Sequence, residues 1–347
     1  MLFYVARRLG LAVLVAVTVS FVAYLLVFVS GDPAVALAGE GARAADIALI
    51  RHTYGFDRPI PVQYADWLFK LLHGELGTSV YFKTEVGPLI ADKLPTTLIL
   101  GAASILVALV ISVPLGVLAA IHRHSWIDRL CLGIVVLGQA LPNFFFALLL
   151  IMLFSITWHV LPVSGSGTWK HFVMPALALG YYAAPAFMRL IRAGMIEVLD
   201  ADYIRTARAK GLPARTVIFK HALRNAIVPV VALSAVQLGF LLGGSVVVEA
   251  IFALDGLGYL AYQSISNKDF PVMQVIVLLL SVIYVALTLA ADIANAWLDP
   301  RIRVACCRPA CPRSPNCPRW PSRRHRRPRC DACSPTRRCW SAAACCS

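Results

Sequence analysis

The chain has 347 residues, of which 59% are hydrophobic and only 14% charged, and its formal net charge is +14. Soluble domains carry about 25% charged residues, so this composition excludes an ordinary soluble protein and favours lipid as the main solvent. Residues 304–347 hold ten arginines, one acid and nine of the ten cysteines. Most of the net charge thus belongs to residues 304–347 and does not indicate nucleic-acid binding by the rest of the chain. Because Cys131 is the single cysteine before residue 304, a disulfide framework or a cysteine metal cluster is excluded there.

Apolar runs long enough to cross about 30 Å of hydrocarbon predict an all-α, polytopic membrane protein with six transmembrane helices. The first run follows Arg7 and Arg8, as in a signal peptide, but its length favours an uncleaved span. Prolines and a glycine interrupt the fourth run, which neighbouring helices can accommodate. The six predicted spans lie at roughly 9–29, 96–121, 130–157, 172–192, 226–250 and 272–297.

The lysines and arginines of the short loops predict that both termini are cytoplasmic. Eight of them follow the fourth span, whereas the two short loops on the opposite side contain only Lys170 and Lys268. Residues 1–30 are interpreted as the cytoplasmic N-terminus with the first span, and 31–94 as an external segment. Amphipathic stretches within 31–94, at 47–53 and 62–72, predict a small helical subdomain packed on the bundle.

The last 44 residues differ from the rest of the chain. Residues 304–347 are rich in Cys, Arg, Pro and Ser and show no helical or strand period. We interpret them as a disordered tail, or as a frameshifted translation beyond a natural end near Arg303. Cys330 and Cys333 have C-x2-C spacing, but a zinc site needs about four ligands on a supporting fold, so no metal site is expected.

Residues 95–303 form the expected transmembrane domain, and its loop at 195–228 has the pattern of two short helices. Asp200 or Asp202 is expected to cap the first helix, and Gly211 to supply the left-handed residue after its end. Pro213 suits the first turn of the second helix, which is expected to run into the fifth span near Pro229. A plain basic loop would explain the arginines but not the succession of helix, glycine, proline and helix. An ordered element that docks on a partner protein is therefore predicted.

The stretch Tyr203-Ile-Arg-Thr-Ala-Arg-Ala-Lys-Gly211, followed by Asn225-Ala-Ile-Val-Pro229, resembles the EAA loop of ABC importer permeases. Arg205 and Thr206 stand where the general motif has Glu and Ala, and this departure resembles the peptide and nickel subfamily. Other segments that resemble the same subfamily are Gly31-Asp-Pro33, Leu94-Pro-Thr-Thr-Leu98, Ala140-Leu-Pro142, Val248-Glu-Ala-Ile-Phe252, Gly256-Leu-Gly258 and Leu298-Asp-Pro-Arg301.

The resemblance implies a type I ABC importer permease fold in the inner membrane, with residues 31–94 periplasmic. The implied partners are a second permease, two cytosolic ATPase subunits and a periplasmic substrate-binding protein. The sequence has no G-x-x-x-x-G-K-[ST] loop, so no ATP site, catalytic residue or cofactor is expected in this chain. The residues implied in coupling to the ATPase are Tyr203, Arg205, Thr206, Ala207, Lys210, Gly211, Arg224 and Pro229.

The substrate implied by the resemblance is a di- or oligopeptide, with nickel or glutathione as the alternatives. An ion-coupled secondary transporter would need more membrane-embedded charges and repeated broken helices than this chain offers. A membrane-bound enzyme would need an acid–base or metal-binding cluster at the membrane face, which the sequence does not suggest.

Few polar side chains lie within the predicted spans. Gln139, Asn143 and Gln237 are candidates for lining a pore or for hydrogen bonding between helices. Ionisable groups at membrane depth usually face a cavity or a partner, so Glu249 and Asp292 could lie on a translocation path. The preferred interpretation makes Glu249 an interfacial surface residue and Asp292 a helix-end group near the cytoplasm.

Small residues in the fifth span predict a close helix approach. These are Gly239, Gly243 and Gly244. Glycines let helix backbones come near one another in lipid, where van der Waals packing drives association. The partner surface expected for this stripe is the second permease.

Overall fold

The computed structural model describes residues 2–30, 33–38 and 41–298. Within these ranges the regular structure is helical, apart from an isolated bridge between Thr78 and Glu85, so the predicted all-α fold is confirmed. The tail at 304–347 lies outside the described residues, as do Gly31, Asp32 and residues 299–301 of the motif segments quoted above.

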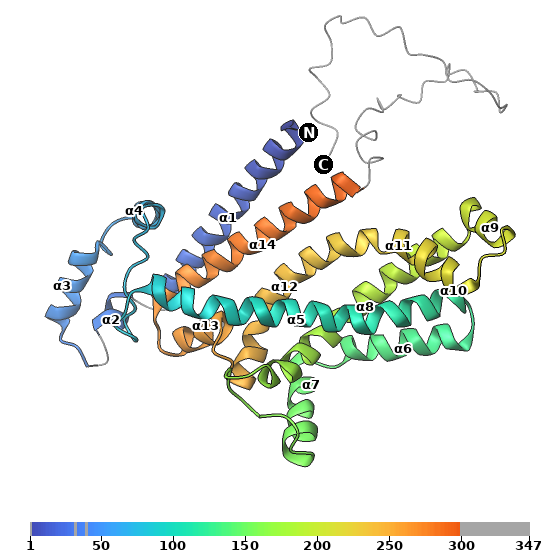
Figure 1. Ribbon diagram of the computed structural model, residues 1–347. Helices are drawn as coiled ribbons and strands as arrows, with labels where there is room; N and C mark the ends of the chain where they lie inside the picture. Colours follow the sequence, from blue (N-terminus) through green and yellow to red (C-terminus); the bar gives the residue numbers. More distant parts are fainter. Residues whose placement is uncertain (1, 31–32, 39–40, 299–347) are drawn as a thin grey trace, which may run out of the picture. The chain divides into compact units, whose positions relative to one another are not determined.

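Long helices running beside one another form the main body of the chain (Figure 1). Among the described residues, three helices are long and apolar enough to cross a membrane, or four if a bent pair counts as one span. The six-span count and the orientation of the termini therefore stay predictions. The long helices are α1 (Leu2–Ser30), α5 (Val86–Ile121), α6 (Trp126–Ala140), α8 (Lys170–Leu199), α12 (Val228–Phe252) and α14 (Phe270–Leu298).

The third predicted span is not one continuous helix. It consists of α6, α7 (Asn143–Leu150) and the π-helical η1 (Ile151–Thr157), with a bend of 99° between α6 and α7. Leu141 is extended, with φ −86° and ψ 133°, because the ring of Pro142 disfavours helical backbone in the residue before it. Proline also lacks the N–H that would continue the helix. The span predicted at 130–157 is therefore interrupted at Leu141 and Pro142 by a bend that the sequence pattern did not predict.

The second predicted span begins earlier than expected. Helix α5 starts at Val86 rather than near residue 96, and Pro95 lies inside it. Its first turns are held by burial: Val86 and Ile90 pack with Leu257 and Val272 in one hydrophobic cluster. Tertiary packing thus extends the helix through a proline that local preference would place near its start.

The centre of the bundle is the contact between α5 and α8. A Cβ added at Gly180 would lie 2.6 Å from the carbonyl oxygen of Ser104, and one at Gly116 would lie 2.9 Å from the side chain of Ile191. Because neither distance leaves room for a methyl group, the two backbones approach as only glycine permits. Phe187 and Ile191 are fully buried beside this contact.

Helices α12 and α14 also approach closely. A Cβ at Gly239 would lie 2.8 Å from the ring of Tyr284 in α14. The close approach predicted from the glycines is thus confirmed at Gly239, and its partner there is a helix of the same chain. Gly243 and Gly244 have no described atom within 4 Å of an added Cβ.

The segment predicted to be external is helical, as expected. It contains α2 (Pro33–Ala38), α3 (Ala44–Tyr54) and α4 (Ile60–Leu72). The hydroxyl oxygens of Ser20 in α1 and Tyr64 in α4 are 2.5 Å apart, and the ring of Tyr64 packs edge-on against Phe21. Helix α4 is thereby fixed on the first long helix.

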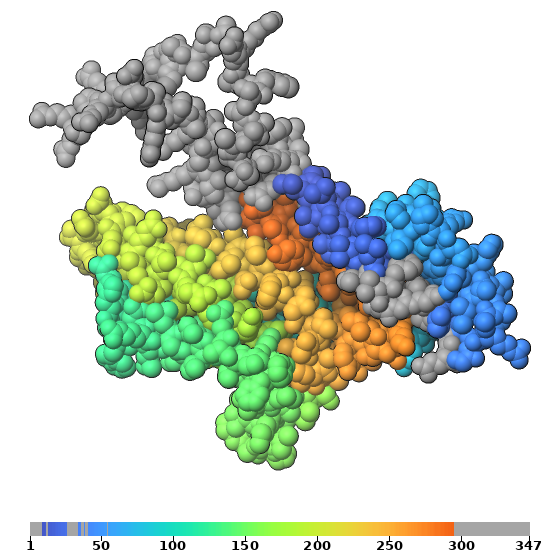
Figure 2. Space-filling model, turned by 180° about the vertical axis from the view of Figure 1, so that it is seen from behind, coloured from blue at the N-terminus to red at the C-terminus, as the bar shows by residue number. Residues whose placement is uncertain are grey.

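Four short helices and a longer one complete the fold. Both views place α9, in the yellow-green region, and the blue helices α3 and α4 at opposite ends of the bundle (Figures 1 and 2). This separation places the predicted docking loop and the predicted external segment far apart. The remaining elements are α9 (Asp202–Ala209), α10 (Ala214–Thr216), the π-helical η2 (Val217–Ala222), α11 (Leu223–Ala226) and α13 (Leu257–Ser266).

Candidate functional site

Helix α9 has one buried side chain and a polar exposed surface. Ile204 is completely buried and belongs to the main hydrophobic core. Ala207 is half-buried against the same core, and Tyr203 is 45% exposed. Arg205, Thr206, Lys210 and Gly211 of the predicted set are exposed. One side of α9 is therefore packed on the core of the bundle, and its other side is an exposed surface available to a partner.

The end of α9 is a Schellman motif. Gly211 has φ 76°, in the left-handed region, as predicted. Its N–H donates to the carbonyl of Arg208 at 3.0 Å, and the N–H of Leu212 donates to that of Ala207 at 3.4 Å. These two bonds satisfy carbonyls that the helix end would leave open, and the left-handed residue that closes the motif is usually glycine.

The start of α9 differs from the prediction. Ala201 is the N-cap residue and has no side-chain cap, so the expectation that Asp200 or Asp202 caps this helix is wrong. Asp200 ends α8 instead, and its carboxylate pairs with Arg123 at 3.0 Å. Asp202 lies in the first turn, where a negative charge still favours the helix dipole.

Beyond Gly211 the chain continues through three short helical pieces into α12. Pro213 was predicted in the first turn of the second helix, but it is the extended N-cap residue directly before α10. The Asn225 side-chain amide donates to the Tyr203 hydroxyl at 2.9 Å, so the second half of the loop is bonded to the first. Arg224 and Pro229 are exposed.

The structure adds an ion pair that sequence reasoning missed. Arg192, near the end of α8, donates from Nε to Asp128 Oδ1 at 2.8 Å and from Nη2 to Oδ2 at 2.7 Å. Asp128 also accepts the backbone N–H of His124 and is only 6% exposed in its side chain. Ser125 caps α6 by accepting the Asp128 N–H at 3.4 Å. A serine three residues before an acid is an N-terminus signature that could have identified Asp128.

Toward the other end of α12, Glu249 is completely buried, so its predicted position at the interfacial surface is wrong. Its Oε1 accepts hydrogen bonds from the hydroxyls of Thr97 at 3.1 Å and Ser245 at 2.8 Å. Its Oε2 accepts the backbone N–H groups of Gly258 at 2.8 Å and Tyr259 at 3.2 Å. A buried carboxylate needs such partners, and these four groups from three helices supply them.

Two glycines make room for this carboxylate. A Cβ at Gly256 would overlap Glu249 Oε2, and one at Gly258 would lie 2.9 Å from the same oxygen. Thr97 completes the site because its hydroxyl also accepts the N–H of Leu257 at 2.8 Å. Three of the separate motif segments found in the sequence thus meet at one buried site.

The candidate pore residues do not form one group. Gln139 is exposed at the end of α6, while Asn143 and Gln237 are half-buried. Asn143 Oδ1 is buried and has no hydrogen-bond partner among the described residues. Asp292 is half-buried near the end of α14. A role in lining a pore stays a prediction for Gln139, Asn143 and Gln237.

A bundle of apolar helices with one ordered, charged loop at its end, here residues 195–228, is the architecture expected of a transporter's membrane subunit. The chain belongs to the family described as "Binding-protein-dependent transport system inner membrane component", which matches residues 112–304. The N-terminal family of the same systems matches residues 1–101. The chain is thus an inner-membrane permease subunit, and ATP hydrolysis belongs to partner subunits. Such systems also contain a second permease and a substrate-binding protein.

Similar proteins agree with this assignment. The "Glutathione transport system permease protein GsiC" of Salmonella typhimurium is 40% identical over 307 residues, which cover 87% of this chain and 99% of the relative. The protein of the same name from Pectobacterium atrosepticum is 38% identical over 301 residues, covering 87% and 98%. A chain of the MetNI methionine ABC transporter, solved in inward-facing conformations, matches with a TM-score of 0.52 at 22% identity, covering 61% of this chain and 96% of that one. This last likeness supports the fold.

Proposed function

We propose that this permease serves the import of small peptides, and that glutathione, a tripeptide, is the substrate best supported. The observation that carries the proposal is the likeness to glutathione permeases at 38–40% identity over nearly their whole length. This choice keeps the peptide class expected from the sequence and favours the glutathione alternative within it. The permease provides the path across the membrane, while the binding protein selects the solute.

The second part of the proposal concerns α9. We infer that its exposed surface contacts an ATPase subunit and passes ATPase movement to the long helices. Three contacts support this role. The buried Ile204 fixes α9 on the main hydrophobic core, and the Tyr203–Asn225 hydrogen bond joins the two halves of the loop. The Arg192–Asp128 pair joins α8, which leads into the loop, to α6. Coupling of this kind requires an element in contact with both moving bodies.

Uptake of labelled solutes tests the substrate. The permease, its partner permease, the ATPases and the binding protein encoded with them are expressed together in a host that lacks its own glutathione and peptide importers. Labelled glutathione should accumulate when ATP is present, and should do so faster than a labelled dipeptide or nickel. Equal background uptake of glutathione with and without this permease would contradict the proposal.

Charge reversal on α9 tests the contact with the ATPase. The double substitution Arg205→Glu and Arg208→Glu changes exposed side chains and leaves the buried Ile204 in place. The variant should insert into the membrane but retain less ATPase on purification. The matched control is Arg43→Glu, an exposed arginine just before α3. Equal ATPase retention in all three proteins would contradict the docking role of α9.

A further inference from the structure

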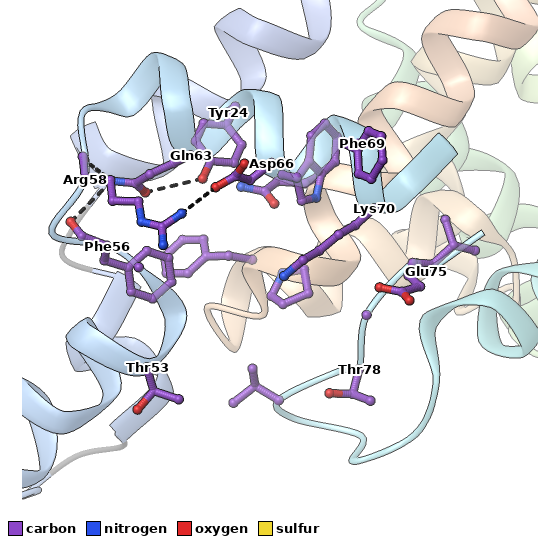
Figure 3. A pocket seen from close by; sticks show the side chains of 18 of the residues that line it. Tyr24, Thr53, Phe56, Arg58, Gln63, Asp66, Phe69, Lys70, Glu75 and Thr78 are labelled. Atoms are coloured by element: carbon purple, nitrogen blue, oxygen red, sulfur yellow. Dashed lines mark hydrogen bonds and ion pairs between the residues drawn. The ribbon is translucent and has the colours of Figure 1, made fainter. Parts of the chain in front are cut away.

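A cavity of about 740 Å³ lies among the helices of the external segment (Figure 3). Its walls come from α3, α4, the segment at 75–80 and the start of α14. Cavities of about 300–1,000 Å³ are the usual size of small-molecule sites in proteins. The volume therefore suits a solute of tripeptide size.

One wall of the cavity is fixed by hydrogen bonds within the protein. The side-chain amide of Gln63 donates to the carbonyl oxygens of Phe56 at 3.2 Å and Arg58 at 2.6 Å. The hydroxyl of Tyr24 donates to Gln63 Oε1 at 3.4 Å, which joins this wall to α1. Gln63 is 7% exposed, so the bonds that hold the wall are largely shielded from water. A wall fixed in this way has little conformational freedom left to lose when a ligand binds, which lowers the entropic cost of binding.

The charged groups on the cavity fall into two sets. Arg58 and Asp66 neutralise each other at 2.9 Å. Lys70, Lys268 and Glu75 also line the cavity, and none of the three makes an ion pair with a described residue. Figure 3 shows the side chains of Lys70 and Glu75 extending from α4 and from the segment after it. Two cations and one anion are thus left for a ligand.

The position of Lys268 is set by its neighbour. Asp269 is 1% exposed and accepts the Ser79 hydroxyl and the backbone N–H groups of Val80 and Tyr81, each N–H at 3.3 Å. Lys268 has φ 56°, a left-handed conformation unfavourable for a residue with a side chain. The Asp269 contacts hold the turn in this conformation and keep Lys268 on the cavity wall.

An aromatic surface completes the site. Trp67 lines the cavity and packs against Tyr24 and Tyr64, with ring centroids 5.8 and 5.9 Å apart. Phe69 lines it as well. Apolar surface with a few oriented charges is the usual composition of a site for a small organic solute.

We propose that this cavity is a receiving site for a small peptide-like solute with two carboxylates and one ammonium group. Lys70 and Lys268 bind the carboxylates, Glu75 binds the ammonium, and Trp67 packs against the backbone of the solute. The site deepens the proposed function, because glutathione carries this set of charges. Solute released at the outer face would be held here by the permease itself before it enters the bundle.

Direct binding tests the proposal. The complex of both permeases and both ATPases is placed in lipid nanodiscs without the binding protein and titrated with labelled reduced glutathione. Saturable binding is expected, and it should become roughly tenfold weaker in the double variant Lys70→Gln and Lys268→Gln, a loss of about 1.4 kcal/mol in binding free energy. The matched control Lys170→Gln removes an exposed lysine that does not line the cavity and should bind as the wild type does. Glutathione diethyl ester, which lacks both carboxylates, should not compete.

Two results would overturn the site. One is the absence of saturable glutathione binding to the wild-type complex, and the other is equal affinity in the wild type and the double lysine variant. If the double variant instead binds the separately added binding protein more weakly while its glutathione affinity is unchanged, the cavity is a protein-docking surface and the proposal is wrong. Uptake by wild-type cells is measured in parallel. Uptake without binding at the cavity rejects the site alone, whereas no uptake rejects the proposed substrate.

Discussion

Glu249 of α12 caps α13, because its Oε2 accepts the backbone N–H of Gly258 at 2.8 Å. The helix dipole places partial positive charge at this N-terminus, so the carboxylate is favoured there as an anion as well as a hydrogen-bond acceptor. The same side chain binds Thr97 of α5 at 3.1 Å. One buried residue therefore joins three helices whose residues are up to 162 positions apart in the chain.

Glu249→Ala should destabilise the protein strongly. The substitution leaves the N–H groups of Gly258 and Tyr259 and the hydroxyl of Thr97 without the acceptor that Glu249 provides. Each buried unsatisfied group costs about 1–3 kcal/mol, so the apparent Tm of the purified complex should fall by about 5 °C or more. The matched control is Glu197→Ala, an exposed glutamate in α8. A Tm equal to that of the control would show that the carboxylate is not needed as a cap.

Gly258→Ala should be harmful although it adds a single methyl group. The new Cβ would lie 2.8 Å from the Cα of Val246 and 2.9 Å from Glu249 Oε2, and a backbone atom cannot move aside cheaply. Overpacking of this kind costs about 1–3 kcal/mol. Gly133→Ala, in α6, meets no atom within 4 Å and should leave the thermal unfolding curve nearly unchanged. Equal curves for the two variants would contradict the close packing around Gly258.

The two ion pairs near the docking loop should differ in strength. Arg192→Ala leaves the Asp128 carboxylate, whose side chain is only 6% exposed, without its partner, which costs about 1–3 kcal/mol. Arg123→Ala breaks a pair whose side chains are 50% and 61% exposed and should cost less than about 1 kcal/mol. Denaturation of the purified complex measures both.

A double-mutant cycle separates the Arg192–Asp128 interaction from other effects of the substitutions. Asp128→Ala combined with Arg192→Ala should lose clearly less stability than the sum of the single variants, since no buried charge is left unpaired. Strictly additive losses would mean that the pair contributes nothing beyond its separate side chains.

Gly211→Val should disconnect ATP hydrolysis from uptake while the protein still inserts into the membrane. Valine is branched at Cβ and resists φ 76°, so the Schellman end of α9 cannot form without strain. Gly211→Asn is the matched control, because asparagine enters the left-handed region more readily than other residues with a side chain. Uptake and ATPase rates in proteoliposomes measure the effect. Normal uptake by the valine variant would exclude a role for this turn in coupling.

The docking loop could be predicted because its signals are local. Gly211 and Pro213 set backbone angles through their own chemistry: Gly211 has the expected left-handed conformation, and Pro213 lies one residue before the helix that it was expected to begin. The prediction of the N-cap was wrong, although it also rested on local signals. Ala201 is the N-cap residue, and the Asp200 carboxylate pairs with Arg123. A cap preference is worth about 1 kcal/mol, which a tertiary contact can outweigh.

Glu249 could not be predicted from its surroundings in the sequence. Its position near the end of an apolar run is typical of an interfacial side chain, and that interpretation ignored partners far away in the chain. Thr97 lies 152 residues earlier, and the two N–H donors follow a turn whose geometry depends on two glycines. The bend at Pro142 was missed for another reason, because hydropathy measures the length of a run and takes no account of its direction.

The π-helical η2 has a consequence for how this loop can change in length. Each turn of a π-helix contains about one more residue than an α-helical turn, and such turns commonly arise within α-helices. An inserted residue between Gly211 and Pro229 can therefore be taken up at 217–222 while the helices on either side keep their rotational setting. Sequences that differ by one residue here can present the same side of α9 outward, so an alignment gap in this region need not signal a different partner.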